Sequence, residues 1–239
     1  MKLDIAPGIV LWRGKLAPGA QSALLADVLA RVETAPFYTP RMPKSGAPFS
    51  VAMTNFGSLG WISDERGYRY EGQHPQTRAA WPAIPPLLLD LWDETTGYEA
   101  APECCLVNLY RNGARMGLHR DADEEARDAP VLSISLGDTA QFRIGGTTRK
   151  DPTRSLTLSS GDVLVFGGLA RMAYHGIDRV LAGSSQLLPG GGRLNLTLRR
   201  VTPVHKKRRV TGTARAALRR GHKKTPGHLD RPRRLAAQT

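Results

Sequence analysis

Apolar residues recur at helical spacing in residues 20–32, near the start of the chain. Five of them fall on one face of a helix: Leu24, Leu25, Val28, Leu29 and Val32. A second helix is expected over residues 85–96, because two prolines favour its first turn and Gly97 is suited to end it. The pattern therefore predicts two helices before residue 100.

A different pattern begins at Cys104. Short apolar segments alternate with Gly, Asp and Asn turns: CCLVNLYR, VLSISLG, QFRI, SLTL, DVLVF and RLNLTLRR. Several short strands at close spacing predict an all-β barrel or sandwich, and the jelly roll is one such fold. Residues 51–56 indicate a further strand. Residues 57–74 are polar and aromatic, and we expect them to form an exposed functional loop or hairpin.

Charge separates the C-terminal end of the chain from the rest. The 239 residues hold 34 Lys and Arg against 21 Asp and Glu, for a net charge of +13. Residues 203–239 contain 12 of these bases and one of the acids, so they carry +11 and the remainder carries +2. The apolar pattern also stops there, which predicts a disordered basic tail in which residues 213–220 could become helical on binding. We expect it to tether the protein to nucleic acid; a solubilising or ribosome-attracted extension is the alternative.

Several features predict a cytoplasmic protein. No stretch approaches the ~18 consecutive apolar residues of a membrane span, and the N-terminus does not resemble a signal peptide. The only cysteines, Cys104 and Cys105, are adjacent, so they are expected to be buried, inert thiols in a reducing compartment. The organisation expected is an N-terminal helical or extension region over 1–50, a core domain over 51–202 and the tail over 203–239.

Two histidines and one carboxylate form a candidate metal site. His119 and Asp121 are two positions apart, so on a strand they would face the same side. His175 would complete a facial triad, a ligand set that suits iron, manganese or zinc. The alternatives are an accidental H-x-D tripeptide and a structural role for His175.

The last predicted strand places polar and apolar residues on opposite faces. Arg193, Asn195, Thr197 and Arg199 share one face, and Leu194, Leu196 and Leu198 share the other. Two arginines inside a barrel are costly without an anion, and no run of acids in the preceding strands supplies two partners. A bound dicarboxylate would supply them, because guanidinium matches carboxylate geometry. An edge strand with a solvated basic face is the alternative.

These motifs together resemble the AlkB family of iron(II)- and 2-oxoglutarate-dependent dioxygenases, in its bacterial form. The resemblance runs from about residue 51 to 201 and rests on several motifs in the family's order. They are Asn108-x-Tyr110, His119-x-Asp121-x-Asp123, His175 and Arg193-x-Asn195-x-x-x-Arg199, with GWISDERGYRY at 60–70, GARMGLHRDADE at 113–124, GGTTRKDP at 145–152 and GDVLVFGG at 161–168.

The resemblance implies a mainly β (α+β) fold and assigns residues to it. The fold would be a double-stranded β-helix, or jelly-roll, core with N-terminal helices and a nucleotide-recognition lid at about 51–80. His119, Asp121 and His175 would bind iron. The residues expected to contact 2-oxoglutarate are Asn108, Tyr110, Arg193, Asn195 and Arg199. Those expected on the substrate side are Trp61, Tyr68, Asp123 and Arg149, with Ser133 and Phe142 as pocket walls.

The activity that the resemblance implies is oxidative demethylation of N-alkylated bases, such as 1-methyladenine and 3-methylcytosine. Iron(II), 2-oxoglutarate and O₂ would be required, and formaldehyde, succinate and CO₂ released. The partner would be single- or double-stranded DNA, or RNA, bound by a monomer. The alternatives are an oxygenase of the same fold that acts on RNA, protein or small molecules, and a non-catalytic nucleic-acid-binding module. Asp123 would favour a positively charged methylated base, unless it is a solvated acid in a loop that also contains Glu124 and Glu125.

Overall fold

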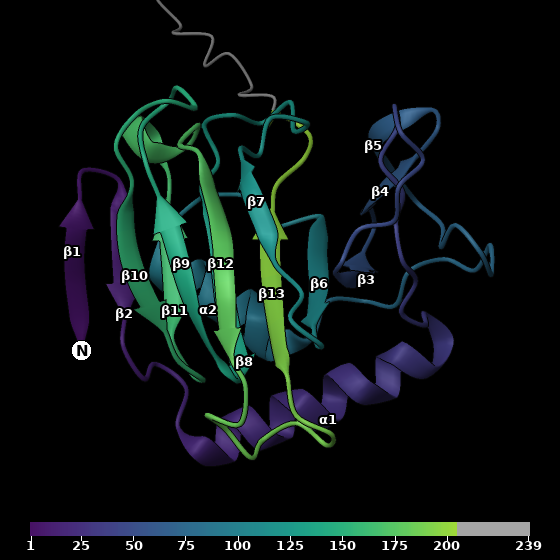
Figure 1. Ribbon diagram of the computed structural model, residues 1–239, viewed down its shortest axis with the longest axis horizontal. Helices are drawn as coiled ribbons and strands as arrows, with labels where there is room; N and C mark the ends of the chain where they lie inside the picture. Colours follow the sequence, from purple (N-terminus) through teal and green to yellow (C-terminus); the bar gives the residue numbers. More distant parts are fainter. Residues whose placement is uncertain (205–239) are drawn as a thin grey trace, which may run out of the picture. The chain divides into compact units, whose positions relative to one another are not determined.

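Two β-sheets face each other in the computed structural model, which describes residues 1–204 (Figure 1). The larger sheet has seven strands, in the order β1 (Lys2–Ala6), β2 (Ile9–Trp12), β11 (Val163–Phe166), β8 (Val131–Gly137), β13 (Arg193–Arg199), β6 (Cys104–Tyr110) and β3 (Ala52–Gly57). The smaller sheet has four, in the order β10 (Arg154–Leu158), β9 (Thr139–Ile144), β12 (His175–Leu181) and β7 (Met116–His119). The tail from residue 205, with its possible helix at 213–220, lies outside the described residues.

From β6 onward the chain passes back and forth between the two sheets, and both sheets are antiparallel. β8 of the larger sheet is followed by β9 and β10 of the smaller one, then by β11 of the larger sheet and β12 of the smaller. Apolar side chains from both sheets, such as Leu106, Phe142 and Phe166, pack between them. This is the double-stranded β-helix, or jelly roll, and the predicted fold class is confirmed.

Two helices cover the outer face of the larger sheet (Figure 1). The helix α1 (Pro18–Thr34) buries Leu24, Leu25 and Val28. The helix α2 (Pro86–Thr96) buries Leu88, Leu91 and Trp92, and ends at Gly97, whose φ of 61° is the left-handed conformation expected of a C-terminal glycine. The predicted α1 face was too wide, because Leu29 is 41% exposed.

The alternation of β13 divides its side chains between two environments. Leu194, Leu196 and Leu198 pack with the helices in the outer core. The polar side chains, at positions 193, 195, 197 and 199, line a pocket between the sheets. The predicted polar interior is therefore confirmed, and the alternative of a solvated edge strand is wrong, because β13 is paired on both sides, with β6 and β8.

The N-terminus adds a hairpin that the sequence pattern did not predict. β1 and β2 pair with each other, and β2 continues the larger sheet by pairing with β11. Residues before position 50 thus share a sheet with the predicted core domain, and Met1–Val204 forms one unit. Cys104 and Cys105 are free and buried, as expected. Neither of the two described α-helices is long and apolar enough to cross a membrane.

A separate two-stranded sheet projects beside β3. It consists of β4 (Gly60–Asp64) and β5 (Gly67–Glu71), and it confirms the expected hairpin. The side chain of Asn55 in β3 holds the base of this hairpin, because it both accepts from the Trp61 amide and donates to the Trp61 carbonyl, at 3.0 Å each. Gly60 permits this approach, since a Cβ there would lie 2.4 Å from the Trp81 ring. The hairpin is therefore attached to the main sheet at Trp61.

Candidate metal and co-substrate site

Strand pairing brings the three predicted metal ligands together. His119 ends β7 and His175 begins β12, and the two residues are opposite each other in the antiparallel pair. Their ring centroids lie 4.5 Å apart. Asp121 follows β7 directly, and one ligand atom from each of the three residues lies within 4.8 Å of the others. Residues far apart in the chain thus form one compact ligand set at the ends of two paired strands.

The two histidines present nitrogen lone pairs to this site. His119 Nδ1 lies 2.9 Å from the Gly117 carbonyl oxygen, and His175 Nδ1 lies 3.0 Å from that of Ala173. A carbonyl oxygen only accepts, so each Nδ1 carries the proton and each Nε2 is free to bind a metal. Burial lowers the pKa of His175 to about 4, which keeps its imidazole neutral at neutral pH.

The third ligand, Asp121, is held in its ionised form. Burial by itself would raise the pKa of this carboxyl, but Arg199, the two imidazoles and Arg171 together outweigh burial and hold the pKa well below its usual range. Arg199 contacts Oδ2 at 2.9 Å, whereas Oδ1 lies 4.0 Å from His119 Nε2. One carboxylate oxygen therefore faces the histidines. Two imidazole nitrogens and one carboxylate oxygen are a donor set that fits iron(II).

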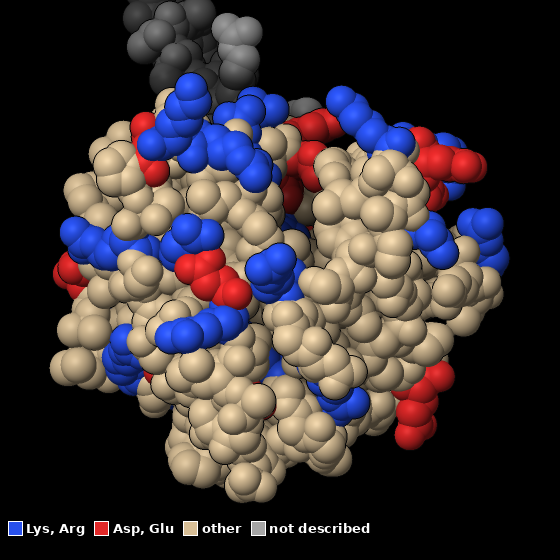
Figure 2. Space-filling model, in the orientation of Figure 1, with Lys and Arg blue, Asp and Glu red and all other residues tan. Residues whose placement is uncertain are grey.

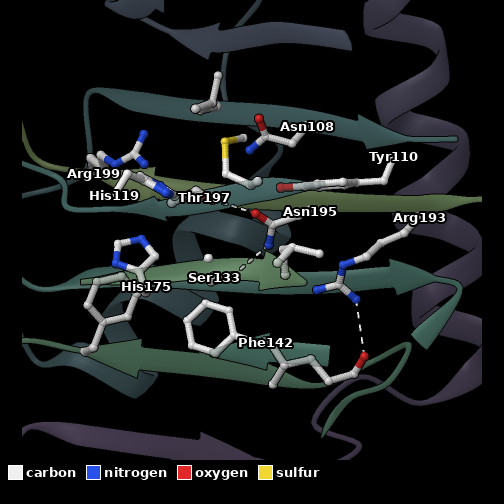
Figure 3. A pocket seen from close by; sticks show the side chains of 16 residues that line it. Asn108, Tyr110, His119, Ser133, Phe142, His175, Arg193, Asn195, Thr197 and Arg199 are labelled. Atoms are coloured by element: carbon white, nitrogen blue, oxygen red, sulfur yellow. Dashed lines mark hydrogen bonds between the residues drawn. The ribbon is translucent and has the colours of Figure 1, made fainter. Parts of the chain in front are cut away.

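A pocket lined by both polar and apolar side chains extends from His119 and His175 between the two sheets (Figure 3). Its lining includes all five residues predicted to contact the co-substrate, and also Ser133 and Phe142. Three of its buried polar atoms have no hydrogen-bond partner within residues 1–204: Asn108 Oδ1, Arg193 Nε and Arg199 Nη1. Buried polar atoms are rarely left unpaired, so this pocket fits a polar ligand. Tyr110 is available as a donor, since burial raises its pKa to about 12.

The two arginines of β13 lie at opposite ends of this pocket (Figure 3). Arg199 is paired with Asp121 and also lies 3.4 Å from a carboxylate oxygen of Glu124. The prediction that both arginines lack acidic partners is therefore wrong for Arg199, because the partners come from the segment after β7 rather than from the strands. It holds for Arg193, which forms no ion pair with any residue of the described chain.

Arg193 is completely buried and is surrounded by neutral acceptors. It donates to Ser135 Oγ at 2.8 Å and to the carbonyls of Leu158 and Asp138 at 3.3 and 3.4 Å. Burial lowers its pKa to about 10, which still leaves it charged at neutral pH. A buried cation without a counter-ion is unfavourable, so this end of the pocket fits an anionic group of a ligand.

On the hairpin side, the structure connects three of the four predicted substrate residues. Trp61 and Tyr68 stack, with ring centroids 5.4 Å apart and 23° between the ring planes. The Trp61 indole Nε1 donates to Asp123 Oδ2 at 2.9 Å. Arg149 is exposed in the loop between β9 and β10 and does not line the pocket. The aromatic pair is thus joined to a carboxylate two residues beyond the metal ligand Asp121.

Two buried charged residues next to the site were not predicted. Glu124, considered only as a loop acid, is 3% exposed and pairs with Arg171 at 3.0 Å. Arg171, which is also buried, donates to the backbone carbonyl of Asp121 at 2.8 Å. No local pattern distinguishes Glu124 from the exposed Glu125. The third histidine of this part of the chain, His74, is buried away from the site, where its Nε2 donates to the Pro36 carbonyl.

The jelly roll and its triad define a metal-dependent oxygenase, and comparison with known proteins agrees. The 2OG-Fe(II) oxygenase superfamily model matches residues 8–199. The chain therefore belongs to this superfamily, within which it is a member of the AlkB family, and its cofactors are iron(II), 2-oxoglutarate and O₂.

Two relatives that establish this membership, from Caulobacter vibrioides and Escherichia coli, match most of the chain. A Caulobacter vibrioides alpha-ketoglutarate-dependent dioxygenase AlkB homolog is 61% identical over 83% of this chain and 90% of its own. Alpha-ketoglutarate-dependent dioxygenase AlkB of Escherichia coli is 41% identical, with 82% and 91% covered. A DNA N(6)-methyladenine demethylase of Arabidopsis thaliana, ALKBH1C, is 42% identical over 41% of this chain and 24% of its own. The solved structure of OsALKBH1 superposes with a TM-score of 0.75 at 29% identity, covering 84% of this chain and 100% of that one.

Proposed function

We propose that this protein oxidatively demethylates N-alkylated bases, such as 1-methyladenine and 3-methylcytosine, in DNA or RNA, and thereby repairs alkylation damage directly. It would do so as a monomer in the cytoplasm. The observation that carries the substrate assignment is the hydrogen bond between Trp61 and Asp123. It joins an aromatic stacking surface to a carboxylate only two residues from the metal ligand Asp121.

The β13 arginines support one orientation of 2-oxoglutarate. Arg193 provides the unpaired cation at one end of the pocket, which suits the distal carboxylate. Arg199 already holds Asp121, which places it at the metal end with the oxo-acid group. Asn108 and Tyr110 on β6, with Asn195 on β13, offer further hydrogen bonds along the pocket. These residues orient the co-substrate so that its 2-oxo end meets the three metal ligands.

The hairpin provides the surface for the base. Trp61 and Tyr68 have extended apolar faces, and Tyr68 is 47% exposed, so a base can reach this stack from solvent. Stacking on an aromatic side chain stabilises a bound base by about 1–3 kcal/mol. A base in a duplex must leave its helix to reach such a site, so the substrate is either single-stranded or flipped.

Asp123 supports selection of a cationic base. Methylation at position 1 of adenine or position 3 of cytosine gives the ring a positive charge, which unmodified bases lack. Asp123 uses Oδ2 to hold Trp61, and its other oxygen can face the base. Two opposite charges about 4 Å apart attract each other by roughly 1 kcal/mol in bulk water and by roughly 4 kcal/mol near a protein surface. Either value is enough to favour the charged, damaged base.

When bound, iron(II) and 2-oxoglutarate would supply the oxidising chemistry: 2-oxoglutarate would become succinate and CO₂, and one oxygen atom of O₂ would enter the N-methyl group. The hydroxymethyl group then leaves as formaldehyde and restores the base. The protein binds and orients the reactants. Nε2 of His119 and of His175 and the carboxylate of Asp121 would hold the metal, and Trp61 and Asp123 would hold the base.

Basic side chains support a nucleic-acid partner. Figure 2 shows Lys and Arg gathered on the upper part of the face that carries β9, β12 and β7, with acidic groups between this part and the hairpin. Exposed basic residues adjoining these strands in the chain include Arg120, directly after β7, and Arg149 and Lys150, between β9 and β10. Such residues suit phosphate contacts, which fix the position of a strand without reading its sequence.

The proposed reaction is tested by loading the full chain with iron(II) and 2-oxoglutarate without oxygen, then adding O₂ and oligonucleotides that carry 1-methyladenine or 3-methylcytosine. Formaldehyde and succinate are expected together, in amounts that match the repaired base. An oligonucleotide without methylation is the control and should release no formaldehyde. Succinate without demethylation of either base would overturn the substrate assignment and leave the oxygenase assignment standing.

Asp123→Asn is expected to reduce selection for charged bases. The amide oxygen can still accept from Trp61 Nε1, so the stack is kept and only the charge is lost. We expect kcat/KM for 1-methyladenine to fall about 10-fold, equivalent to about 1.4 kcal/mol, while kcat/KM for the neutral lesion 1-methylguanine stays the same or rises. An equal fall for both bases would show that Asp123 acts through geometry alone.

A further inference from the structure

A buried group of four charged side chains lies behind the metal ligands. Asp121 and Glu124 supply two carboxylates, and Arg171 and Arg199 supply two guanidinium groups, with all four residues at least nine-tenths buried. Because burial of unpaired charge is costly, such a group persists only when its charges balance. The only member of this group expected to bind the metal is Asp121, so the role of Glu124 requires an explanation.

Glu124 contacts side chains from three separate parts of the chain. Its Oε2 pairs with Arg171 Nη2 at 3.0 Å, and its Oε1 lies 3.4 Å from Arg199 Nε. The hydroxyl of Tyr70, on β5 of the hairpin, donates to the same Oε1. One carboxylate thus joins β5, β13 and the segment between η1 (Gly168–Ala170) and β12.

Both arginines that Glu124 holds also hold Asp121. Arg199 contacts the Asp121 side chain at Oδ2, at 2.9 Å, and Arg171 donates to the Asp121 backbone carbonyl at 2.8 Å. The position of Asp121 and the direction of its free carboxylate oxygen therefore depend on Arg199 and Arg171. Both arginines are in turn held in position by Glu124. Groups in this outer position commonly tune metal affinity. Neutralising Glu124 would also leave excess positive charge beside a site for a divalent cation.

The same carboxylate is connected to the base-stacking residue. Tyr70 is directly opposite Trp61 in the β4–β5 pair, so their side chains lie on the same side of the hairpin. The hydrogen bond from the Tyr70 hydroxyl to Glu124 therefore attaches β5 to the buried charged group that contains Asp121. Trp61 is itself joined to Asp123, one residue before Glu124.

We propose that Glu124 is a positioning residue that couples the β4–β5 hairpin, through Tyr70, to the metal ligand Asp121, through Arg199 and Arg171. Its part in metal binding needs only the metal site, whereas its part in base binding rests on the proposed function. Glu124 therefore affects both the affinity for the metal and the affinity for the substrate, although it contacts neither of them.

Glu124→Gln in the full chain tests the coupling, because it removes the charge and nearly preserves the shape. With 2-oxoglutarate present, Mn(II) affinity, measured from the electron paramagnetic resonance signal of free Mn(II), is expected to fall about 10-fold, the lower end of outer-shell effects. KM for a methylated oligonucleotide is expected to rise severalfold. Glu125→Gln removes a charge from the exposed neighbour and should change neither value.

Tyr70→Phe separates the two branches of the coupling. It removes only the hydroxyl that reaches Glu124, so KM for the oligonucleotide should rise while Mn(II) affinity stays at the wild-type value. Thermal unfolding shows whether each variant is folded. If Glu124→Gln is not, Glu124→Asp keeps the charge, withdraws the carboxylate by one methylene and should shift both values in the same direction.

Wild-type Mn(II) affinity in the folded Glu124 variant would overturn the proposal, and so would an equal loss in Glu125→Gln. An unchanged oligonucleotide KM in Tyr70→Phe would overturn the hairpin branch. The Mn(II) measurement uses no nucleic acid. It therefore remains readable if the protein proves not to demethylate bases, and failure of the proposed function can be told from failure of this inference.

Discussion

Replacing His119 with alanine is expected to abolish both 2-oxoglutarate turnover and base demethylation. The variant retains only two of the three metal ligands, so its metal affinity should fall by more than the roughly 10–100-fold that loss of an outer-shell partner costs. His119 is 40% exposed. Its removal should therefore change the free energy of unfolding by no more than about 0.5 kcal/mol. Succinate and formaldehyde release, together with Mn(II) affinity and thermal unfolding, measure all three effects.

Asp121→Ala gives the informative contrast to this variant. It removes a ligand too, but it also leaves Arg199 buried with only the more distant Glu124 as a partner. Breaking a buried ion pair from one side costs roughly 3–5 kcal/mol, so this variant should lose both activity and stability. If His119→Ala kept 2-oxoglutarate turnover, the triad would not be the metal site. A non-catalytic binding module predicts no turnover in the wild-type protein either.

The sequence predicts the parts of this fold that depend on local alternation. The strict alternation over residues 193–199 identifies which side chains of β13 face the pocket, because side chains of a strand point to opposite faces in turn. The same holds for the ends of α2, where proline and glycine act through their own backbone geometry. The β1–β2 hairpin was not predicted, because its place depends on pairing with β11, more than 150 residues later.

The candidate site also contains some features that the sequence predicts and others that depend on contacts between distant segments. The triad candidates and the two arginines of β13 follow from local sequence patterns, whereas the co-substrate roles of Asn108, Tyr110 and Asn195 rest on the family resemblance. The pairing of β7 with β12 brings the two histidines together. The acidic partners of Arg199 could not be predicted, because they lie in a loop whose burial depends on η1, β12 and β13. The Trp61–Asp123 hydrogen bond joins residues 62 positions apart, and nothing in either segment alone indicates it.

Replacing Arg193 with methionine is expected to change co-substrate affinity and protein stability in opposite directions. Methionine nearly fills the same volume and removes a buried cation that has no counter-ion among residues 1–204. The free energy of unfolding of the ligand-free protein should therefore stay the same or rise, since apolar replacement of buried charge is often neutral or stabilising. The loss of one partner from a buried charge pair with 2-oxoglutarate costs about 2–5 kcal/mol, so the Kd for 2-oxoglutarate should rise at least ~30-fold.

A shorter oxo-acid shows whether Arg193 acts on the distal carboxylate. 2-Oxobutyrate keeps the oxo-acid end that faces the metal and lacks the distal carboxylate, so the wild-type protein should bind it much more weakly than 2-oxoglutarate. Arg193→Met should lose most of this preference, because the only group that distinguishes the two acids no longer meets a cation. Arg193→Lys keeps the charge without the guanidinium fork and should retain part of it. If the preference survived intact in Arg193→Met, the distal carboxylate would have to be held by another residue, and the orientation proposed for the co-substrate would be wrong.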